Sequence, residues 1–215
     1  MIKAVIFDMD GLMIDSEPLH YEAYAAVFRE LGKKYPLEDN NRLYIGLSDK
    51  DQATDMVDRY SLSLSQEEIV KRKQQEFKKL IATSLTPQKG LMKLLSYLKK
   101  KKYKIAIASS SGNEEIALVI QSLKIKSYID TYCSADEVRH AKPAPDLFLL
   151  AAKKLHVKPD ECVVLEDSPR GIEAAVQAGM VSFAIPSEQT KDKDFSKATK
   201  KLKSLEEVTK QLKNI

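Results

Sequence analysis

The stretch MIKAVIFDMDGLMID, residues 1 to 15, places two carboxylates directly after an apolar run that is typical of a buried β-strand. The run over residues 2 to 7 is rich in β-branched side chains, and Gly11 indicates the loop that follows. Asp8 and Asp10 therefore stand at the carboxyl end of a predicted central strand, where open α/β sheets bind their ligands. Side chains two apart on an extended chain share a side, so both carboxylates can face one pocket. An Asp that ends a strand is also a common turn or N-cap residue, which leaves a purely structural role open.

The composition is that of a globular protein. The chain has 215 residues and a mass of 24.2 kDa, with 43% hydrophobic and 31% charged residues. This length suits one large core, or a core domain with a smaller insertion. No apolar run approaches the ~20 residues of a membrane span, and the N-terminus enters a strand without the layout of a signal peptide. We expect a cytosolic protein.

The charge pattern favours a solvated surface. The formal net charge is +4, and lysines cluster at residues 99–102 and 191–213. Acidic residues are almost as numerous as basic ones, 31 against 35, so the clusters are typical of helix ends and tails. We expect no nucleic-acid or membrane partner, and a monomer.

The cysteines and histidines do not form a recognisable metal site. Cys133 and Cys162 are far apart in apolar surroundings, which is typical of small core residues. The histidines, His20, His140 and His156, are scattered along the chain, which argues against a zinc site.

Residues 16 to 82 show helical periodicity and no convincing strand. A first helix is predicted over 17–31, where Gly32 ends it, and a second over 48–60. The capping box that begins at Ser65 predicts a third helix to about residue 81. The segment therefore reads as a small all-helical module inserted directly after the first strand.

Strands and helices alternate after residue 83. The predicted strands cover residues 103–108, 129–133, 162–165 and 181–185, and the predicted helices cover 88–101, 113–123, 145–155 and 169–178. This alternation predicts an α/β fold, a Rossmann-like doubly wound parallel sheet. We predict a core domain of residues 1–15 and 83–215 and a helical cap domain of residues 16–82.

Each further predicted strand also ends in polar residues. Ser109 follows the strand KIAIA, and the helix predicted to begin at Asn113 would direct its N–H groups to the same edge. Lys142 lies in the loop HAKPAPD, and Glu166 and Asp167 follow the strand VVL. The carboxyl ends of parallel strands meet at one edge of a sheet, so we expect these side chains to gather there.

This combination suits phosphate chemistry. Mg²⁺ prefers oxygen ligands such as carboxylates, water and phosphate. Two carboxylates and a phosphate dianion repel one another, by about 1 kcal/mol per pair at ~4 Å in water and ~4 kcal/mol at a dielectric constant of 20. A metal ion and a lysine would offset this repulsion. A carboxylate can then attack phosphorus and form an aspartyl phosphate that water hydrolyses.

The order of these motifs resembles that of the haloacid dehalogenase superfamily of phosphohydrolases. Asp8-Met9-Asp10-Gly11, Ser109, Lys142 and Glu166-Asp167 each follow a hydrophobic strand in the order that the family has. The helical insertion looks like the family's small cap domain. The segments DGLMIDSEPLH at 10–20 and KPAPD at 142–146 resemble the β-phosphoglucomutase and sugar-phosphate phosphatase branch.

The resemblance implies catalytic roles for four residues. Asp8 would be the nucleophile, and Asp10 would be the acid that protonates the leaving oxygen and the base that activates water. Ser109 and Lys142 would hold the phosphoryl oxygens. A carboxylate at position 10 separates this chain from true dehalogenases, so carbon–halogen cleavage is not expected.

The resemblance also implies a Mg²⁺ site. Its ligands would be Asp8, the main-chain carbonyl of Asp10, and Asp167. Glu166 would be a further ligand or would act through one of the others.

The cap is expected to carry specificity by closing over the site. His20 and Lys73 match cap positions of the mutase branch, and with Gly46, Ser110 and Asn113 they are the candidate substrate-binding residues. A lone histidine on a helix, or a lysine in the charged run KRKQQEF, is also a common surface residue. A substrate-binding role and a surface position both stay open for His20 and Lys73.

One departure from the mutase branch favours a phosphatase. The matching cap loop reads Gly46-Leu47-Ser48-Asp49-Lys50, with Asp49 where a mutase carries an arginine that grips a second phosphate. An acidic residue would repel that phosphate, and Lys50 lacks the bidentate fork of arginine. We therefore expect a Mg²⁺-dependent phosphatase of a small phosphorylated metabolite, and we expect that metabolite to be a sugar phosphate. The alternatives are a phosphosugar mutase and a catalytically silent phosphate-binding module.

Overall fold

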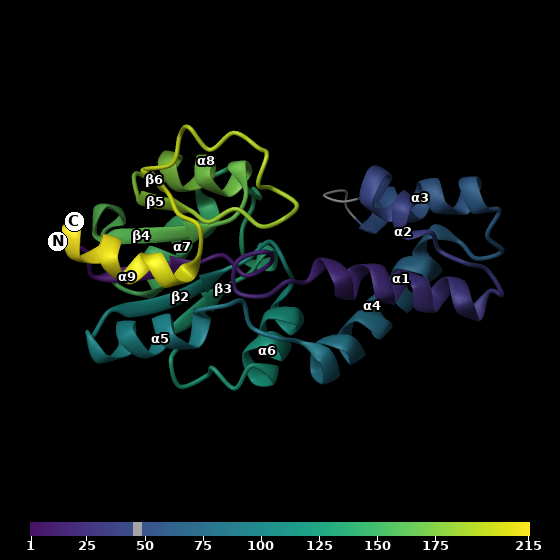
Figure 1. Cartoon of the computed structure of the whole chain (residues 1–215), viewed down its shortest axis with the longest axis horizontal. Helices are drawn as coiled ribbons and strands as arrows, with labels where there is room; N and C mark the ends of the chain where they lie inside the picture. Colours follow the sequence, from purple (N-terminus) through teal and green to yellow (C-terminus); the bar gives the residue numbers. More distant parts are fainter. Residues whose placement is uncertain (45–48) are drawn as a thin grey trace. The chain divides into compact units, whose positions relative to one another are not determined.

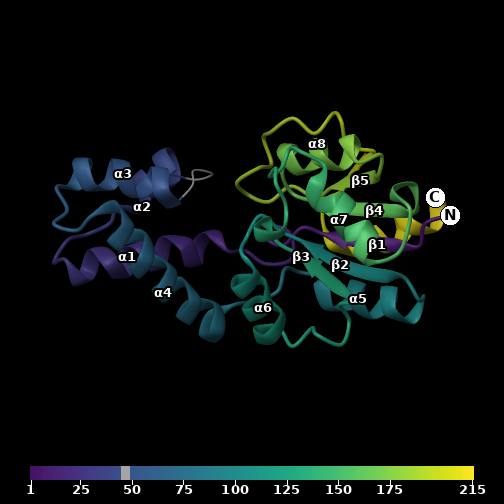
Figure 2. The ribbon, with the colours of Figure 1, turned by 180° about the vertical axis from the view of Figure 1, so that it is seen from behind.

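The computed structural model describes residues 1–44 and 49–215. The chain divides into two compact units, one of Met1–Asp15 with Thr86–Ile215 and the other Ser16–Leu85. The last helix of the second unit continues to Ser84, so the division falls a few residues beyond the expected limit at residue 82. Figures 1 and 2 show the chain from opposite sides.

The larger unit is built on a parallel sheet, as predicted. Its strand order is β3-β2-β1-β4-β5-β6, and every neighbouring pair is parallel. The strands are β1 (Ala4–Phe7), β2 (Lys104–Ala108), β3 (Thr131–Cys133), β4 (Cys162–Glu166), β5 (Val181–Ala184) and β6 (Lys200–Lys201). All four residues of β1 are buried, which explains why this strand reads as an almost unbroken apolar run.

Helices cover both faces of this sheet. Alternate residues of β1, Ala4 and Ile6, pack in one cluster with α7 (Asp146–Lys154) and α8 (Pro169–Gln177). The opposite face is covered by α5 (Leu91–Lys100), which contacts β2 and α9 (Val208–Gln211). Figure 1 shows α5 and α9 in front of the strands, and Figure 2 shows α7 in front from the other side. The remaining helix, α6 (Asn113–Ser122), links β2 to β3.

The smaller unit is helical, as predicted. It contains α1 (Glu17–Glu30), α2 (Leu37–Asp39), a π-helical turn (Asn40–Tyr44), α3 (Asp49–Tyr60) and α4 (Gln66–Ser84). Ser65 caps α4, because its Oγ accepts a hydrogen bond from the N–H of Glu68. The core of this unit is rich in aromatic rings, with Tyr35 in contact with Phe28, Tyr44 and others.

Several elements differ from the sequence-based expectation. Helix α5 begins at Leu91 rather than at residue 88, because Gly90 adopts a left-handed φ of 91° that interrupts the helical backbone. The last part of the chain adds β6 and α9, which are not among the predicted strands and helices. Short 3-10 turns occupy Ala135–Glu137, Pro159–Glu161, Leu205–Glu207 and Leu212–Asn214. Within the described residues, no helix combines the length and apolar character needed to cross a membrane.

Candidate functional site

Asp8 lies at the end of the central strand, beside the ends of the strands that flank it. Phe7 pairs with Ile107 on β2 and with Leu165 on β4. Glu166 follows Leu165 and therefore lies next to Asp8 at the same edge of the sheet. Asp8 is only 6% exposed and Glu166 only 1%. Two buried carboxylates this close need a positive partner.

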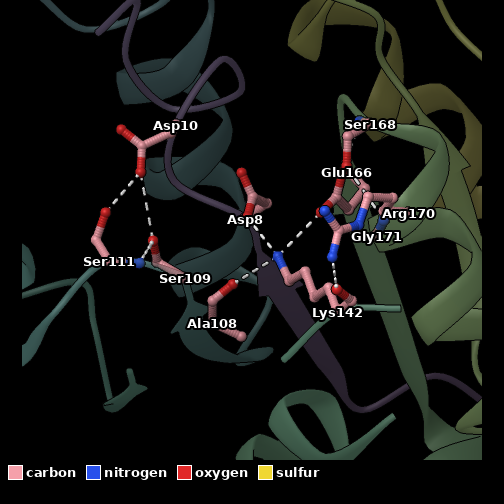
Figure 3. A network of polar contacts seen from close by, with 10 residues as sticks. All are labelled: Asp8, Asp10, Ala108, Ser109, Ser111, Lys142, Glu166, Ser168, Arg170 and Gly171. Carbon is pink, nitrogen blue, oxygen red and sulfur yellow. Dashed lines mark hydrogen bonds and ion pairs between the residues drawn. The ribbon is translucent and has the colours of Figure 1, made fainter. Parts of the chain in front are cut away.

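The Lys142 ammonium is that partner. Its Nζ donates to Asp8 Oδ1 at 2.5 Å, to Glu166 Oε1 at 2.9 Å and to the carbonyl oxygen of Ala108 at 3.1 Å (Figure 3). These bonds use all three ammonium protons. Burial opposes the charge, but Asp8 and Glu166 outweigh it and raise the pKa of Lys142 above its ordinary value. Lys142 is therefore a fixed positive charge at the strand ends.

The second oxygen of Glu166 is held by the start of α8. Glu166 Oε2 accepts from the N–H of Ser168 at 2.6 Å and from its hydroxyl at 2.9 Å. Ser168 also caps the helix, because its Oγ accepts from the N–H of Gly171 at 3.1 Å. Both Glu166 oxygens are thus bonded to protein groups. This bonding favours a role in orienting Lys142 over direct contact with a metal ion.

The same helical turn holds the main chain of Lys142. Arg170 Nη2 donates to the carbonyl oxygen of Lys142 at 2.6 Å (Figure 3). The Phe148 ring lies under the ammonium, with 4.8 Å between Nζ and the ring centroid. Lys142 is therefore fixed at both ends of its side chain.

Asp167 lies against the loop that follows Asp8. A Cβ on Gly11 would be 2.2 Å from Asp167 Oδ2, and Gly11 has a φ of 79°, so only glycine fits here. Burial, followed by the charge of Glu166, raises the pKa of Asp167 to about 7. Burial also raises the pKa of Asp8, although Lys142 opposes the rise. These carboxylates are poorly stabilised as anions without more positive charge nearby.

Asp10 is held by a different set of partners. Its Oδ2 accepts from the Ser111 hydroxyl at 2.9 Å and contacts the Ser109 hydroxyl at 3.4 Å. Its Oδ1 is buried and has no hydrogen-bond partner among the described residues. Figure 3 shows Asp8 on the side of Lys142 and Asp10 on the side of the serines. The two carboxylates are close in sequence but are oriented independently.

Lys73 is buried inside the smaller unit, so the surface reading of this lysine is wrong. It is 2% exposed, and its Nζ donates to both oxygens of Asp49, at 2.7 and 2.9 Å. The ammonium also lies 4.8 Å from the centroid of the Phe77 ring, and His20 stacks on that ring with 4.0 Å between centroids. Tyr24 donates to Asp49 Oδ1 at 3.2 Å. Lys73 therefore balances the charge of Asp49. The sequence analysis treated Asp49 as an unpaired negative charge and did not predict this ion pair.

The other candidate substrate-binding residues have separate positions. Ser110 is exposed, while Ser111 makes the contact with Asp10. The N–H of Asn113 donates to Asp136 Oδ2 at 2.8 Å, so this N–H is already bonded rather than directed at the strand ends as expected. Gly46 lies outside the described residues.

Sequence reasoning did not single out Ser111, Arg170 or Gly171. The sequence could have indicated Ser111. It lies two residues after Ser109, and side chains two apart on an extended chain point to the same side. Arg170 and Gly171 gave no such signal, since their roles depend on how closely α8 approaches the Lys142 loop.

A metal ion would have to use few protein ligands here. Among the described residues, no three aspartate, glutamate, histidine or cysteine side chains form a group ready to hold a metal. Asp8 and Asp167 are two buried carboxylates at neighbouring strand ends. Mg²⁺ commonly takes only one or two carboxylates and completes its shell with water and phosphate oxygens. The donor set therefore suits Mg²⁺ better than zinc.

The sequence model of the haloacid dehalogenase-like hydrolases matches residues 5–185. The chain belongs to this family. A phosphorylated carbohydrates phosphatase of Thermotoga maritima is 35% identical over 179 residues, which are 83% of this chain and 82% of the relative. A β-phosphoglucomutase of Bacillus subtilis is 31% identical over 193 residues, 86% of this chain and 83% of the relative.

The fold of this haloacid dehalogenase-like hydrolase is also known from solved structures. A Thermotoga maritima protein solved as a candidate β-phosphoglucomutase has a TM-score of 0.90 and 31% identity, and the match covers 100% of both chains. The chain is thus an enzyme of the phosphoric monoester hydrolase type, similar to sugar-phosphate phosphatases. The names of its relatives include both phosphatases and a mutase.

Proposed function

We propose that this enzyme is a Mg²⁺-dependent phosphatase of a small phosphorylated metabolite, a sugar phosphate, and that it works through an aspartyl phosphate on Asp8. The observation that carries the proposal is the position of Asp8 at the end of the central strand, with one carboxylate oxygen bonded to Lys142. Holding one oxygen leaves the other as the nucleophile. In this proposal the Asp8 oxygen attacks phosphorus and the bond from phosphorus to the leaving oxygen breaks.

The neighbouring side chains have separate tasks in this scheme. Lys142, which would exchange one of its three protein hydrogen bonds for one to the substrate, and the Ser109 hydroxyl bind phosphoryl oxygens. The charge of Lys142 stabilises the negative charge that develops in transfer. Asp10 gives a proton to the leaving oxygen and then takes one from the water that hydrolyses the aspartyl phosphate. The buried Asp10 Oδ1, which has no partner among the described residues, is available for this proton transfer.

The residues present fit a Mg²⁺ ion. Asp8, Asp167 and the main-chain carbonyl of Asp10 would hold it, and the raised pKa values of both carboxylates support the need for a cation. When bound, Mg²⁺ would neutralise part of the charge on the phosphoryl group. Glu166 would act by orienting Lys142.

The pairing inside the cap supports a phosphatase over a mutase. A mutase has to bind a bisphosphorylated intermediate in two orientations, which requires positive charge for the second phosphate. In this chain the ammonium of Lys73 is already paired with Asp49, so these two positions together supply no net positive charge. A mutase remains the second candidate because the Bacillus subtilis relative carries that name.

A substrate panel separates these functions. The pure protein is incubated with Mg²⁺ and a set of sugar phosphates, and both free phosphate and isomerised sugar phosphate are measured. Release of phosphate without isomerisation supports the phosphatase. Conversion of β-glucose 1-phosphate to glucose 6-phosphate, primed by a bisphosphate, would support the mutase, and no turnover with any substrate would support a silent binding module.

A further inference from the structure

The hydroxyl of Ser111 lies between two carboxylates. Its Oγ is 2.9 Å from Asp10 Oδ2 and 2.9 Å from Glu115 Oε1. Both distances are those of good hydrogen bonds. A hydroxyl has only one proton, so it donates to one carboxylate at a time. The Ser111 hydroxyl is therefore shared between Asp10 and Glu115.

The main chain around Ser111 is held in place. Its N–H donates to Ser109 Oγ at 3.0 Å, and its carbonyl oxygen accepts from the N–H of Ala135 at 3.3 Å. Glu115 is in the first turn of α6, a helix whose Asn113 N–H is bonded to Asp136. These main-chain bonds hold Ser111 beside Asp10 and Glu115 beside Ser111.

The orientation of Asp10 depends on this contact. Of its two oxygens, Oδ1 is buried without a partner among the described residues, and Oδ2 has the contacts with Ser111 and Ser109. The bond to Ser111 is the shorter of the two, at 2.9 Å against 3.4 Å. Removing it would leave the Asp10 carboxylate with one long contact, to Ser109, and its orientation would be less restrained.

We propose that Ser111 is a positioning residue that aims the Asp10 carboxylate at the leaving oxygen, and that Glu115 holds the Ser111 hydroxyl in place. This inference rests on the proposed function, in which Asp10 is the acid. It assigns the two residues no contact with the substrate. Their effect should therefore depend on how much the leaving group needs a proton.

Two substrates test this dependence. A sugar phosphate has an alkoxide leaving group that needs protonation, whereas p-nitrophenyl phosphate has a leaving group that departs without a proton. We compare kcat/KM, which reports the first phosphoryl transfer. Ser111→Ala should lower kcat/KM for the sugar phosphate by about 10-fold or more, as expected for impaired acid catalysis, and should change the value for p-nitrophenyl phosphate by less than about 2-fold.

Conservative variants refine the test. Ser111→Thr keeps a hydroxyl and should restore most of the activity. Glu115→Gln can donate an amide proton to Ser111 Oγ and should retain activity, while Glu115→Ala should show a weaker form of the Ser111→Ala defect. Ser122→Ala, at the other end of α6, is the matched control and should behave as the wild type for both substrates.

The outcomes distinguish this inference from the proposed function. Asp10→Asn should show the same substrate dependence as Ser111→Ala, but more strongly. If Asp10→Asn shows no such dependence, the assignment of Asp10 as the acid is wrong. If Asp10→Asn shows it and folded Ser111→Ala does not, or if Ser111→Ala affects both substrates equally, the positioning role of Ser111 is wrong and the proposed function stands.

Discussion

Gly171 and Glu166 approach each other so closely that no side chain fits between them. A Cβ on Gly171 would lie 1.6 Å from Glu166 Oε1, the oxygen that accepts the bond from Lys142. The absence of a side chain at position 171 therefore lets the Glu166 carboxylate occupy its place beside Lys142. The start of α8 controls the position of this lysine through Glu166 and through Arg170.

Gly171→Ala should move the Glu166 carboxylate and weaken the hold on Lys142. Its methyl group would overlap buried carboxylate oxygens, so we expect a loss of about 1–3 kcal/mol in the free energy of unfolding, as in other overpacked sites. We also expect kcat with a sugar phosphate to fall at least about 10-fold. Denaturant unfolding and steady-state kinetics measure both effects.

Gly32→Ala is a control for stability alone, because nothing lies within 4 Å of a Cβ there, although its φ of 68° adds strain. A Gly171→Ala protein with wild-type kcat would contradict this role of the glycine.

Asp49→Asn should destabilise the smaller unit. The substitution leaves the buried Lys73 ammonium without its carboxylate partner. Breaking a fully buried pair costs about 3–5 kcal/mol, and because the Asp49 side chain is 28% exposed we expect a smaller loss, about 2 kcal/mol. Denaturant unfolding gives the value directly. Asp58→Asn, at an exposed position on the same helix, should change the free energy of unfolding by less than about 0.5 kcal/mol. Equal effects of the two variants would show that the pair contributes little.

The stability of the metal-free enzyme should fall as pH rises. In the folded chain, burial and Glu166 raise the pKa of Asp167 from its ordinary value of 3.8 to about 7, opposed by Lys142 and assisted by Asp10. Between these values the unfolded chain binds fewer protons than the folded chain, so the free energy of unfolding decreases with pH across this window. Thermal unfolding in EDTA at pH 5 and pH 8 measures the change.

Asp167→Asn supplies the control for this pH effect. The asparagine does not titrate, so the unfolding temperature of the variant should fall less between pH 5 and pH 8. Mg²⁺ should raise the unfolding temperature of the wild type at pH 8, because a bound cation stabilises the ionised carboxylates, and should have less effect on the variant. An identical pH dependence in both proteins would show that Asp167 is not responsible.

The sequence predicts the parts of this enzyme that depend on local pattern. The parallel sheet, the helical insertion and the polar residues at the strand ends follow from apolar runs and their spacing, as Asp8 after β1 illustrates. Contacts between distant residues do not follow from such patterns. Lys73 and Asp49 are 24 residues apart, and nothing in the charged run around Lys73 indicates that its side chain is buried. The choice between Ser110 and Ser111 likewise depends on the backbone direction at the start of α6.

Phosphorylation of Asp8 is the central step of the proposed reaction. The direct measurement is mass spectrometry of the phosphorylated enzyme. The enzyme is mixed with Mg²⁺ and a sugar phosphate that it hydrolyses, and the reaction is quenched in acid within one turnover. We predict a phosphoryl group on the peptide that contains Asp8, and none in Asp8→Asn, which should stay folded but inactive. Rapid turnover with no phosphoryl group on that peptide at any quench time, or full activity in Asp8→Asn, would contradict the account.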